Sequence, residues 1–311
     1  MTVLRLTLRP ATPFGTPLVG ETLFGQLCWA MLRLGGRERL EALLEGYLDG
    51  RPYAVLSDAF PKGFIPLPTL PSFLWEAHDE LDRKYLKKKA WLPLEALGEP
   101  RCRWRDLALT DAEAAARFSS GAVSLKTNGV RMHNTINRRT LTTGTGVFAP
   151  YAQPQTWLAP HVPLTVQAVV DEARFSREEL HTALTYVGLA GFGRDATIGL
   201  GKFTVEDDVE TLAAPRASTT HVTLASAVLS TVPGVKAEGT YYKAKTHFGR
   251  HGDALALSGA PFKRPVLLAA GGALVETAEP LTAEFLGAGV GGVSQVQPQT
   301  VHQGYAPVLS I

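Results

Sequence analysis

A glycine-rich segment between residues 191 and 203 combines the residue types that bind phosphate. Its glycines form two G-x-G pairs beside two cations: Gly191, Gly193, Gly199, Gly201, Arg194 and Lys202. Glycine adopts positive φ and has no side chain, so backbone N–H groups there can approach another molecule closely. Positive charge beside such amides suits the oxygens of a phosphate group. The segment predicts a phosphate-binding loop, and the plainer alternative is a tight turn between two elements.

The elements around this glycine loop decide which kind of loop it is. Upstream, Ser176 and Glu179 form a capping-box signature that opens a helix running to about Leu189. Downstream, Phe203–Val205 has the pattern of a strand. The loop thus follows a helix and enters a strand, whereas Rossmann and P-loop sites open a helix. Lys202 precedes an aromatic residue and not Ser or Thr, so a nucleoside triphosphate site is not indicated.

The distribution of charge is the second signal, because the net charge of +2 is small. From Ala114 to Val170 there is no Asp or Glu, and Gly239–Gly252 also has none. The cations inside these two acid-free segments are Arg117, Lys126, Arg131, Arg138, Arg139, Lys243, Lys245 and Arg250. A surface without carboxylates favours a polyanion, since cation–phosphate contacts release counterions. The alternative is a loop-rich region that happens to lack acids.

Hydrophobic periodicity predicts the elements that position these residues. Strands are expected at 3–8 and 164–170, helices at 18–34, 38–48 and 72–97, an extended proline-rich stretch at 57–71 and a hairpin over 128–150. Without the middle insertion, the order is β-α-β-β-α-β, which is ferredoxin-like. We therefore predict an α+β protein with a ferredoxin-like domain over 1–210, carrying an insertion at about 57–160. After a linker, 211–311 is predicted to form a second, smaller ferredoxin-like α+β domain.

Composition bounds the remaining classes. The chain has 311 residues, an ordinary hydrophobic share of 45%, and no apolar run long enough for a membrane helix. We expect a cytoplasmic protein. Cys28 and Cys102 have neither metal-ligand nor disulfide spacing, so no metal and no cofactor are expected.

The chain resembles the RAMP superfamily, the ferredoxin-like RNA-binding proteins of CRISPR systems. The glycine loop fits the RAMP pattern G-x-G-[KR]-x-x-x-G-x-G-x-aromatic at every position. Further segments resemble the type III-A (Csm) effector subunit that binds the repeat-derived 5′ handle, the fourth Csm subunit. They are Ser57–Pro61 followed by Leu67-Pro68, His133–Thr140, Tyr241–Gly252 and His302–Ala306. Members of this group usually have Lys-Pro after a leucine-proline where this chain has Thr69, so the role of Thr69 is left open.

This resemblance implies a binding role and not a nuclease. Such subunits hold the 5′ handle of CRISPR RNA, insert a thumb-like hairpin beside the guide, and dock on the large polymerase/cyclase-like Csm subunit and the backbone-forming Csm RAMP subunit. The resemblance, the glycine loop and the acid-free segments together indicate a set of candidate RNA-binding residues. They are Lys126, Arg131, His133, Asn134, Arg138, Arg139, Thr140, Gly191, Gly193, Arg194, Gly199, Gly201, Lys202, Lys243, Lys245 and Arg250.

Two alternatives stay open at the level of sequence. Some RAMP proteins cut precursor RNA with a histidine base, and His133 stands in a basic segment suited to abstracting a 2′-OH proton. Stacking on a base, or hydrogen bonding to RNA, is the preferred role for this ring. A general single-strand RNA-binding protein unconnected to CRISPR is the other alternative. We find no catalytic Ser-His-Asp or Cys-His arrangement and no metal-ligand spacing, so no catalytic residue is predicted.

Overall fold

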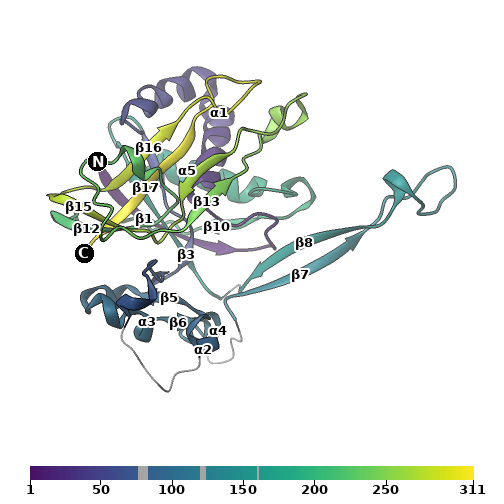
Figure 1. Ribbon diagram of the computed structural model, residues 1–311. Helices are drawn as coiled ribbons and strands as arrows, with labels where there is room; N and C mark the ends of the chain where they lie inside the picture. The colour runs from purple at the N-terminus through teal and green to yellow at the C-terminus, as the bar shows by residue number, and fades with distance from the viewer. Residues whose placement is uncertain (76–82, 120–123, 160) are drawn as a thin grey trace.

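The computed structural model describes residues 1–75, 83–119, 124–159 and 161–311. Figure 1 shows a main body that holds both chain ends, a smaller lobe beneath it, and a long β-hairpin that projects away from both. Helices and strands are both present, so the mixed α+β class is confirmed. Among the described residues, no helix is long and apolar enough to cross a membrane.

The first sheet of the main body has the strand order β10-β1-β9-β2, with every pair antiparallel. The short strands β11 and β3 pair with β1 and β9. The bounds are β1 Thr2–Pro10, β2 Ala54–Leu56, β3 Phe60–Pro61, β9 Leu164–Val170, β10 Phe203–Val205 and β11 Glu210–Thr211. Two helices, α1 (Gly20–Leu44) and α5 (Arg177–Ala190), contact each other. They also contact this sheet, α1 at β2 and α5 at β10. In chain order the elements run β1-α1-β2-β9-α5-β10, which is the predicted order, although the hydrophobic pattern did not locate the strand β2.

Both helices follow the signals in their sequences. In α1, Leu23 and Leu27 lie in the same buried cluster as the strand β1. The backbone turns non-helical at Gly36, where φ is 81°, so the two helices expected here are the two halves of one kinked helix. In α5, the Ser176 hydroxyl accepts from the Glu179 N–H at 3.2 Å, and the Glu179 carboxylate accepts from the Ser176 N–H at 3.1 Å. This capping box fixes where α5 begins. The helix ends at Gly191, whose φ of 100° is not helical, and the glycine loop begins there.

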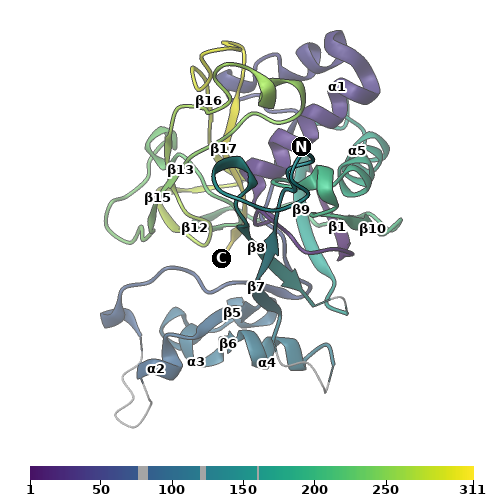
Figure 2. The ribbon, with the colours of Figure 1, turned by 90° about the vertical axis from the view of Figure 1, so that its right-hand side faces the viewer.

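The elements β4 to α4 form the insertion lobe beneath the main body (Figure 2). Its bounds are β4 Phe64–Pro66, α2 Arg83–Leu86, β5 Lys89–Pro93, α3 Trp104–Leu107, β6 Leu109–Thr110 and α4 Asp111–Ala116. The helix expected over 72–97 is wrong, because only Arg83–Leu86 of its described residues are α-helical and Lys89–Pro93 is a strand paired with β4. Residues 76–82 of that expectation lie outside the described residues. Leu92 is fully buried in a cluster with Trp104. This packing outweighs the helical propensity of the segment.

The second half of the main body is built from strands. Their order is β15-β12-β17-β16, with β13 and β14 as a separate pair. The bounds are β12 Ser218–Thr223, β13 Ala244–His247, β14 Val266–Ala269, β15 Leu274–Leu281, β16 Phe285–Val290 and β17 His302–Ser310. No α-helix occurs between 211 and 311, a range that is described throughout, so the helices expected for a second α+β unit are absent. The reason is packing: β17 contacts α1, and Tyr305 joins the core of the first half.

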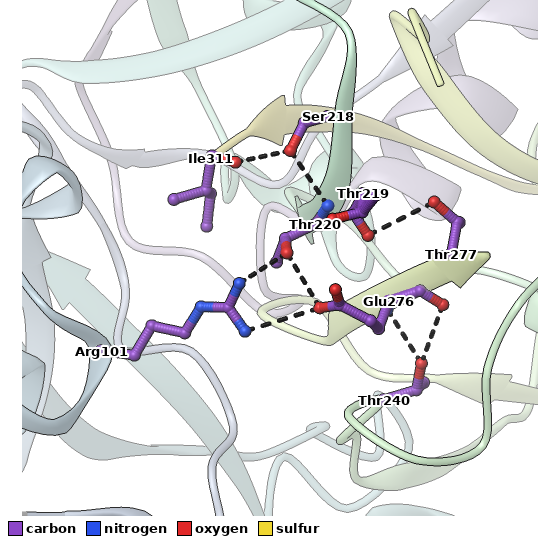
Figure 3. A network of polar contacts seen from close by, with 8 residues as sticks. All are labelled: Arg101, Ser218, Thr219, Thr220, Thr240, Glu276, Thr277 and Ile311. Carbon is purple, nitrogen blue, oxygen red and sulfur yellow. Dashed lines mark hydrogen bonds and ion pairs between the residues drawn. The ribbon is translucent and has the colours of Figure 1, made fainter. Parts of the chain in front are cut away.

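A polar network joins the insertion lobe to the second half (Figure 3). The Arg101 guanidinium donates to the Thr220 hydroxyl at 2.6 Å and lies 3.5 Å from the Glu276 carboxylate. The Thr220 hydroxyl in turn donates to Glu276 at 2.9 Å. Beneath these contacts, apolar residues of the lobe and of β12 and β15 share one buried cluster. The lobe is therefore held to the main body by both apolar and polar contacts.

The projecting hairpin consists of β7 (Lys126–His133) and β8 (Tyr151–Leu158), joined by the tip loop 134–150. The sequence predicts this hairpin, but its strands begin and end outside the expected 128–150. Its base is held by the bridge between Phe14 and Thr156, whose backbone groups exchange hydrogen bonds at 2.8 and 2.9 Å. The rest of the hairpin extends away from the body (Figure 1).

Candidate nucleic-acid interface

The four glycines of the loop all have positive φ, but they differ in the space around them. The φ values are 100° at Gly191, 75° at Gly193, 96° at Gly199 and 75° at Gly201. A Cβ on Gly201 would lie 2.1 Å from the Phe192 carbonyl oxygen, and one on Gly191 would lie 2.7 Å from the Leu200 carbonyl oxygen. A Cβ on Gly199 would meet nothing within 4 Å. Gly199 is therefore the glycine that another molecule can approach.

Most backbone N–H groups of the loop are already used inside the protein. The Phe192 N–H donates to the Gly201 carbonyl at 2.9 Å, and the Gly201 N–H donates to the Pro13 carbonyl at 2.7 Å. Others donate to the hydroxyls of Thr12 and Thr16 at 2.8 and 3.0 Å. The N–H groups with internal partners are those of Gly191, Phe192, Arg194, Ile198, Gly199, Leu200, Gly201 and Lys202. A phosphate at this loop would therefore depend on side chains more than on an array of free amides.

The two cations of the loop play different parts. The Arg194 guanidinium donates to the Pro154 carbonyl of β8 at 2.7 Å and pairs with Asp195 at 3.1 Å. It thus ties the glycine loop to the base of the hairpin, with half of its side chain still exposed. The Lys202 side chain is exposed, and its backbone carbonyl accepts from Ala11 at 2.8 Å. Arg194 therefore positions the loop, while the exposed ammonium group of Lys202 is available to bind a ligand.

A pocket of about 280 Å³ opens where three segments meet. Its lining residues are Phe14–Pro17 after β1, Asn128–Val130 of β7, Pro154–Thr156 of β8, and Arg194. The size is close to the lower end of known ligand pockets, about 300 Å³. Backbone groups, two amide side chains, two hydroxyls and one guanidinium line the pocket together with apolar side chains, which is a suitable lining for a nucleobase. Sequence reasoning missed this site because Phe14, Asn128 and Gln155 are far apart in the chain.

The hairpin carries the candidate residues of the acid-free segment. Lys126 and Arg131 are exposed on β7, and Arg138 and Arg139 are exposed in the tip loop together with Asn134 and Thr140. Within the described part of the chain, none of these four cations forms an ion pair. Their charges meet solvent, so this surface is ready to meet an anion. The structure does not bring the tip loop to the glycine loop, since the hairpin holds it away from the body (Figure 1).

His133 lies at the outer end of β7. Its ring stacks on Tyr151, directly across the hairpin, with ring centroids 5.6 Å apart and planes 18° apart. The Asn137 side chain accepts from the Arg139 N–H at 3.0 Å and shapes the tip loop behind it. The His133 side chain is partly buried, and its Nε2 atom is shielded from solvent without a hydrogen-bond partner among the described residues. The stacked pair of rings adds aromatic character to the hairpin, which suits a role in base stacking.

The three cations of the segment 239–252 separate in the structure. The Lys245 ammonium forms an ion pair with the fully buried Glu21 carboxylate at 2.5 Å and contacts the Ser226 hydroxyl at 3.2 Å. Lys243 is exposed, and Arg250 lies over the ring of Phe262 at 4.9 Å. Lys245 therefore anchors β13 to α1, while Lys243 and Arg250 face solvent.

A buried group of ionisable side chains surrounds this anchor. Burial raises the pKa of Asp58 to about 7, and the neighbouring Glu21 carboxylate contributes to the increase. Asp58 accepts from the N–H of Gly20 at 2.7 Å, at the start of α1. His247 lies 3.5 Å from the same Glu21 oxygen, and burial lowers the pKa of His302 to about 3. The Glu21 side chain is fully buried, and its contacts with Lys245 and His247 join β13 to α1.

No arrangement that would hold a metal was found in the residues described. Groups of three or more His, Cys, Asp or Glu side chains suited to an ion are absent from that part of the chain. His247 and His251, four residues apart, do not share a helix face: His247 ends β13, and His251 contacts the Ser294 hydroxyl at 2.7 Å.

Comparison with solved structures finds the same fold in chains of CRISPR-Cas complexes. No family model matches the chain. All of it aligns with 99% of a chain in the crystal structure of the Csm3-Csm4 subcomplex of the type III-A CRISPR-Cas interference complex, with a TM-score of 0.61 and 16% identity. It also aligns with 98% of a chain in Csm1-Csm4 cassettes bound to cA3 and to one ATP, with TM-scores of 0.59 and 0.58 and 17% identity for both. Csm4 is the subunit that these complexes share. Across its full length, the chain therefore shares its fold with the Csm4 subunit of these complexes.

Proposed function

We propose that this chain is an RNA-binding subunit of a type III-A CRISPR (Csm) effector, which anchors the repeat-derived 5′ handle of CRISPR RNA without cutting it. The observation that carries the proposal is the agreement of fold over the whole chain with subunits of such complexes. In this role the first half is a ferredoxin-like RAMP domain, the hairpin is its thumb, and the strand-rich second half is a reduced second domain. The protein would act in the cytoplasm, in antiviral defence.

The pocket between the glycine loop and the hairpin base supports an RNA ligand. It combines the exposed part of Arg194 with amide and apolar side chains. Lys202 and the open face of Gly199 lie on the same loop. We place the handle across this pocket, with its backbone continuing toward the unpaired cations of β7. Cations supply affinity, and the pocket supplies contacts to a base.

The names of the similar structures suggest the partners. The complexes pair Csm4 with Csm1 and with Csm3. For this chain we propose docking on a large polymerase/cyclase-like subunit and on a backbone-forming RAMP subunit. Co-expression with the large subunit should give a heterodimer that survives size exclusion at micromolar concentration. Elution of two separate monomers would contradict this docking.

One experiment tests the binding role against the catalytic alternative. The purified protein is incubated with repeat RNA in EDTA, and the RNA is followed by gel shift and by denaturing gel. We expect retention of uncut RNA, with tighter binding to the handle sequence than to a scrambled strand of the same length. Site-specific cleavage that is lost in His133→Ala would establish an endoribonuclease. Equal affinity for both strands would indicate a general single-strand RNA-binding protein.

A further inference from the structure

The hairpin formed by β13 and β14 has one face turned to the core and one turned to solvent. From Ala244 to His251 the residues alternate, with every second side chain exposed. The inner residues include Lys245, paired with Glu21, and His251, bonded to Ser294. These inner contacts hold the hairpin on α1 and leave its outer face with no cover from the described residues.

The outer face gathers large side chains that are unusually exposed. The rings of Phe248 and Phe262 are 74% and 67% exposed, and Leu267 of β14 is 70% exposed. Tyr242, just before β13, is 52% exposed. We call Tyr242, Phe248, Arg250, Phe262 and Leu267 the aromatic face. Exposed rings grouped on one surface mark a binding site for a partner or a ligand.

The charge around the aromatic face indicates which ligand it takes. Lys243, Arg250 and Arg264 are exposed and lie within two residues along the chain of Tyr242, Phe248 and Phe262 respectively. Arg250 lies over the Phe262 ring with its guanidinium 4.9 Å from the ring centroid. Asp253, the acid nearest in sequence, is held by hydrogen bonds from Arg33, one of them 2.8 Å long. Rings interleaved with cations suit a single-stranded nucleic acid, because bases stack on the rings while the cations contact phosphates.

We propose that the aromatic face is a second RNA-binding site, on which bases of a single strand stack on Phe248 and Phe262 while Arg250 and Lys243 contact phosphates. The proposal deepens the RNA-binding function proposed above and rests on it for the class of ligand. Nothing in the glycine loop or the β7–β8 hairpin is needed for this stacking, so the two sites can be tested separately. The ligand is recognised by the π-face of a base, and therefore with little sequence preference.

The test compares variants of the full chain binding a fluorescently labelled oligouridylate of about ten nucleotides, a length within the range of single-strand binding sites. Phe248→Ala and Phe262→Ala should each weaken binding at least about fivefold, because base–aromatic stacking contributes about 1 kcal/mol or more. Neither should alter the slope of log K against log salt, since a ring displaces no counterion. Arg250→Ala should instead reduce that slope by about 0.7. Phe248→Trp should retain wild-type affinity.

Controls separate this proposal from its alternatives. Leu257→Ala removes a side chain that is 93% exposed in the loop between β13 and β14 but has no ring, and it should leave affinity unchanged. Equal decreases in this control and in the phenylalanine variants would overturn stacking. Wild-type RNA affinity in both phenylalanine variants would also overturn the proposal. If these variants lost binding to a protein partner but kept their RNA affinity, the aromatic face would be a protein-binding surface. If the wild-type chain bound no RNA at all, the proposed function itself would fail.

Discussion

The glycine loop allows a comparison of two substitutions only two residues apart in the chain. Gly199 and Gly201 both have positive φ, so an alanine at either position adopts a left-handed conformation at a cost of about 1 kcal/mol. Beyond this shared cost the two positions differ. At Gly199 the added methyl group meets open space, while at Gly201 it would lie 2.1 Å from the Phe192 carbonyl oxygen and 2.7 Å from the Phe192 nitrogen.

The clash at Gly201 sets the magnitude of the expected difference. Backbone atoms must move apart, which breaks the 2.9 Å hydrogen bond from the Phe192 N–H to the Gly201 carbonyl. Phe192 is fully buried, and leaving a buried donor unsatisfied costs about 1–3 kcal/mol. We therefore expect Gly201→Ala to lower the free energy of unfolding by about 3 kcal/mol or more, and Gly199→Ala by about 1 kcal/mol.

Urea unfolding of the two alanine variants measures this difference in stability. RNA binding then tests whether Gly199 lies at the ligand site. Gly199→Val should keep the fold and weaken handle binding at least about tenfold, since the added side chain fills the open approach to the loop. Replacing Gly199 and Gly201 together by valine would not separate loss of RNA binding from loss of stability, because the change at Gly201 destabilises the fold. Equal stability of the two alanine variants would refute the packing argument. Normal RNA affinity of Gly199→Val would make the loop a structural turn only.

Three further predictions concern charge. Replacing Arg138 and Arg139 by alanine should reduce the slope of log K for RNA against log salt by roughly 0.7 for each arginine that binds a phosphate, and an unchanged slope would mean that neither does. Burial lowers the pKa of His302 to about 3, so below about pH 6.5 the unfolded state binds more protons and stability falls as pH falls, by up to about 1.4 kcal/mol per pH unit. His302→Gln should make urea midpoints between about pH 4 and 6.5 less dependent on pH. Arg101→Ala should lower the free energy of unfolding by about 1–2 kcal/mol, and Glu276→Gln by a similar amount, because each removes a charged hydrogen bond.

Local signals in the sequence predicted the first half of the fold well. The capping box at Ser176 places the start of α5, and the alternation of leucines in β1 identifies its buried face. Both are properties of adjacent residues, and neither depends on the rest of the chain. The strands β9 and β10 begin and end where the pattern predicts, for the same reason.

Long-range packing explains where the sequence was not sufficient. Lys89–Pro93 pairs with β4, a partner that helical periodicity cannot reveal. In the second half, Tyr305 donates to the Tyr47 carbonyl at 2.7 Å and packs in the first half's core, so helices of its own are not needed there. The pocket at the hairpin base likewise assembles residues from three distant segments.

The candidate cations form classes that the sequence cannot separate. Lys245 is neutralised by Glu21, and Arg194 shares its charge between Asp195 and the Pro154 carbonyl. Arg138 and Arg250 carry charges that face solvent, and neither forms an ion pair with an acid of the described chain. Counterions gather at unpaired charges, so cations already bound to acids contribute little to the salt dependence of RNA binding. If RNA binds as proposed, that dependence should arise at the β7–β8 hairpin and the aromatic face. In the glycine loop only the exposed Lys202 would add to this dependence, while the loop backbone would contribute shape. Removing the acid of the loop through Asp195→Asn should raise RNA affinity by freeing Arg194.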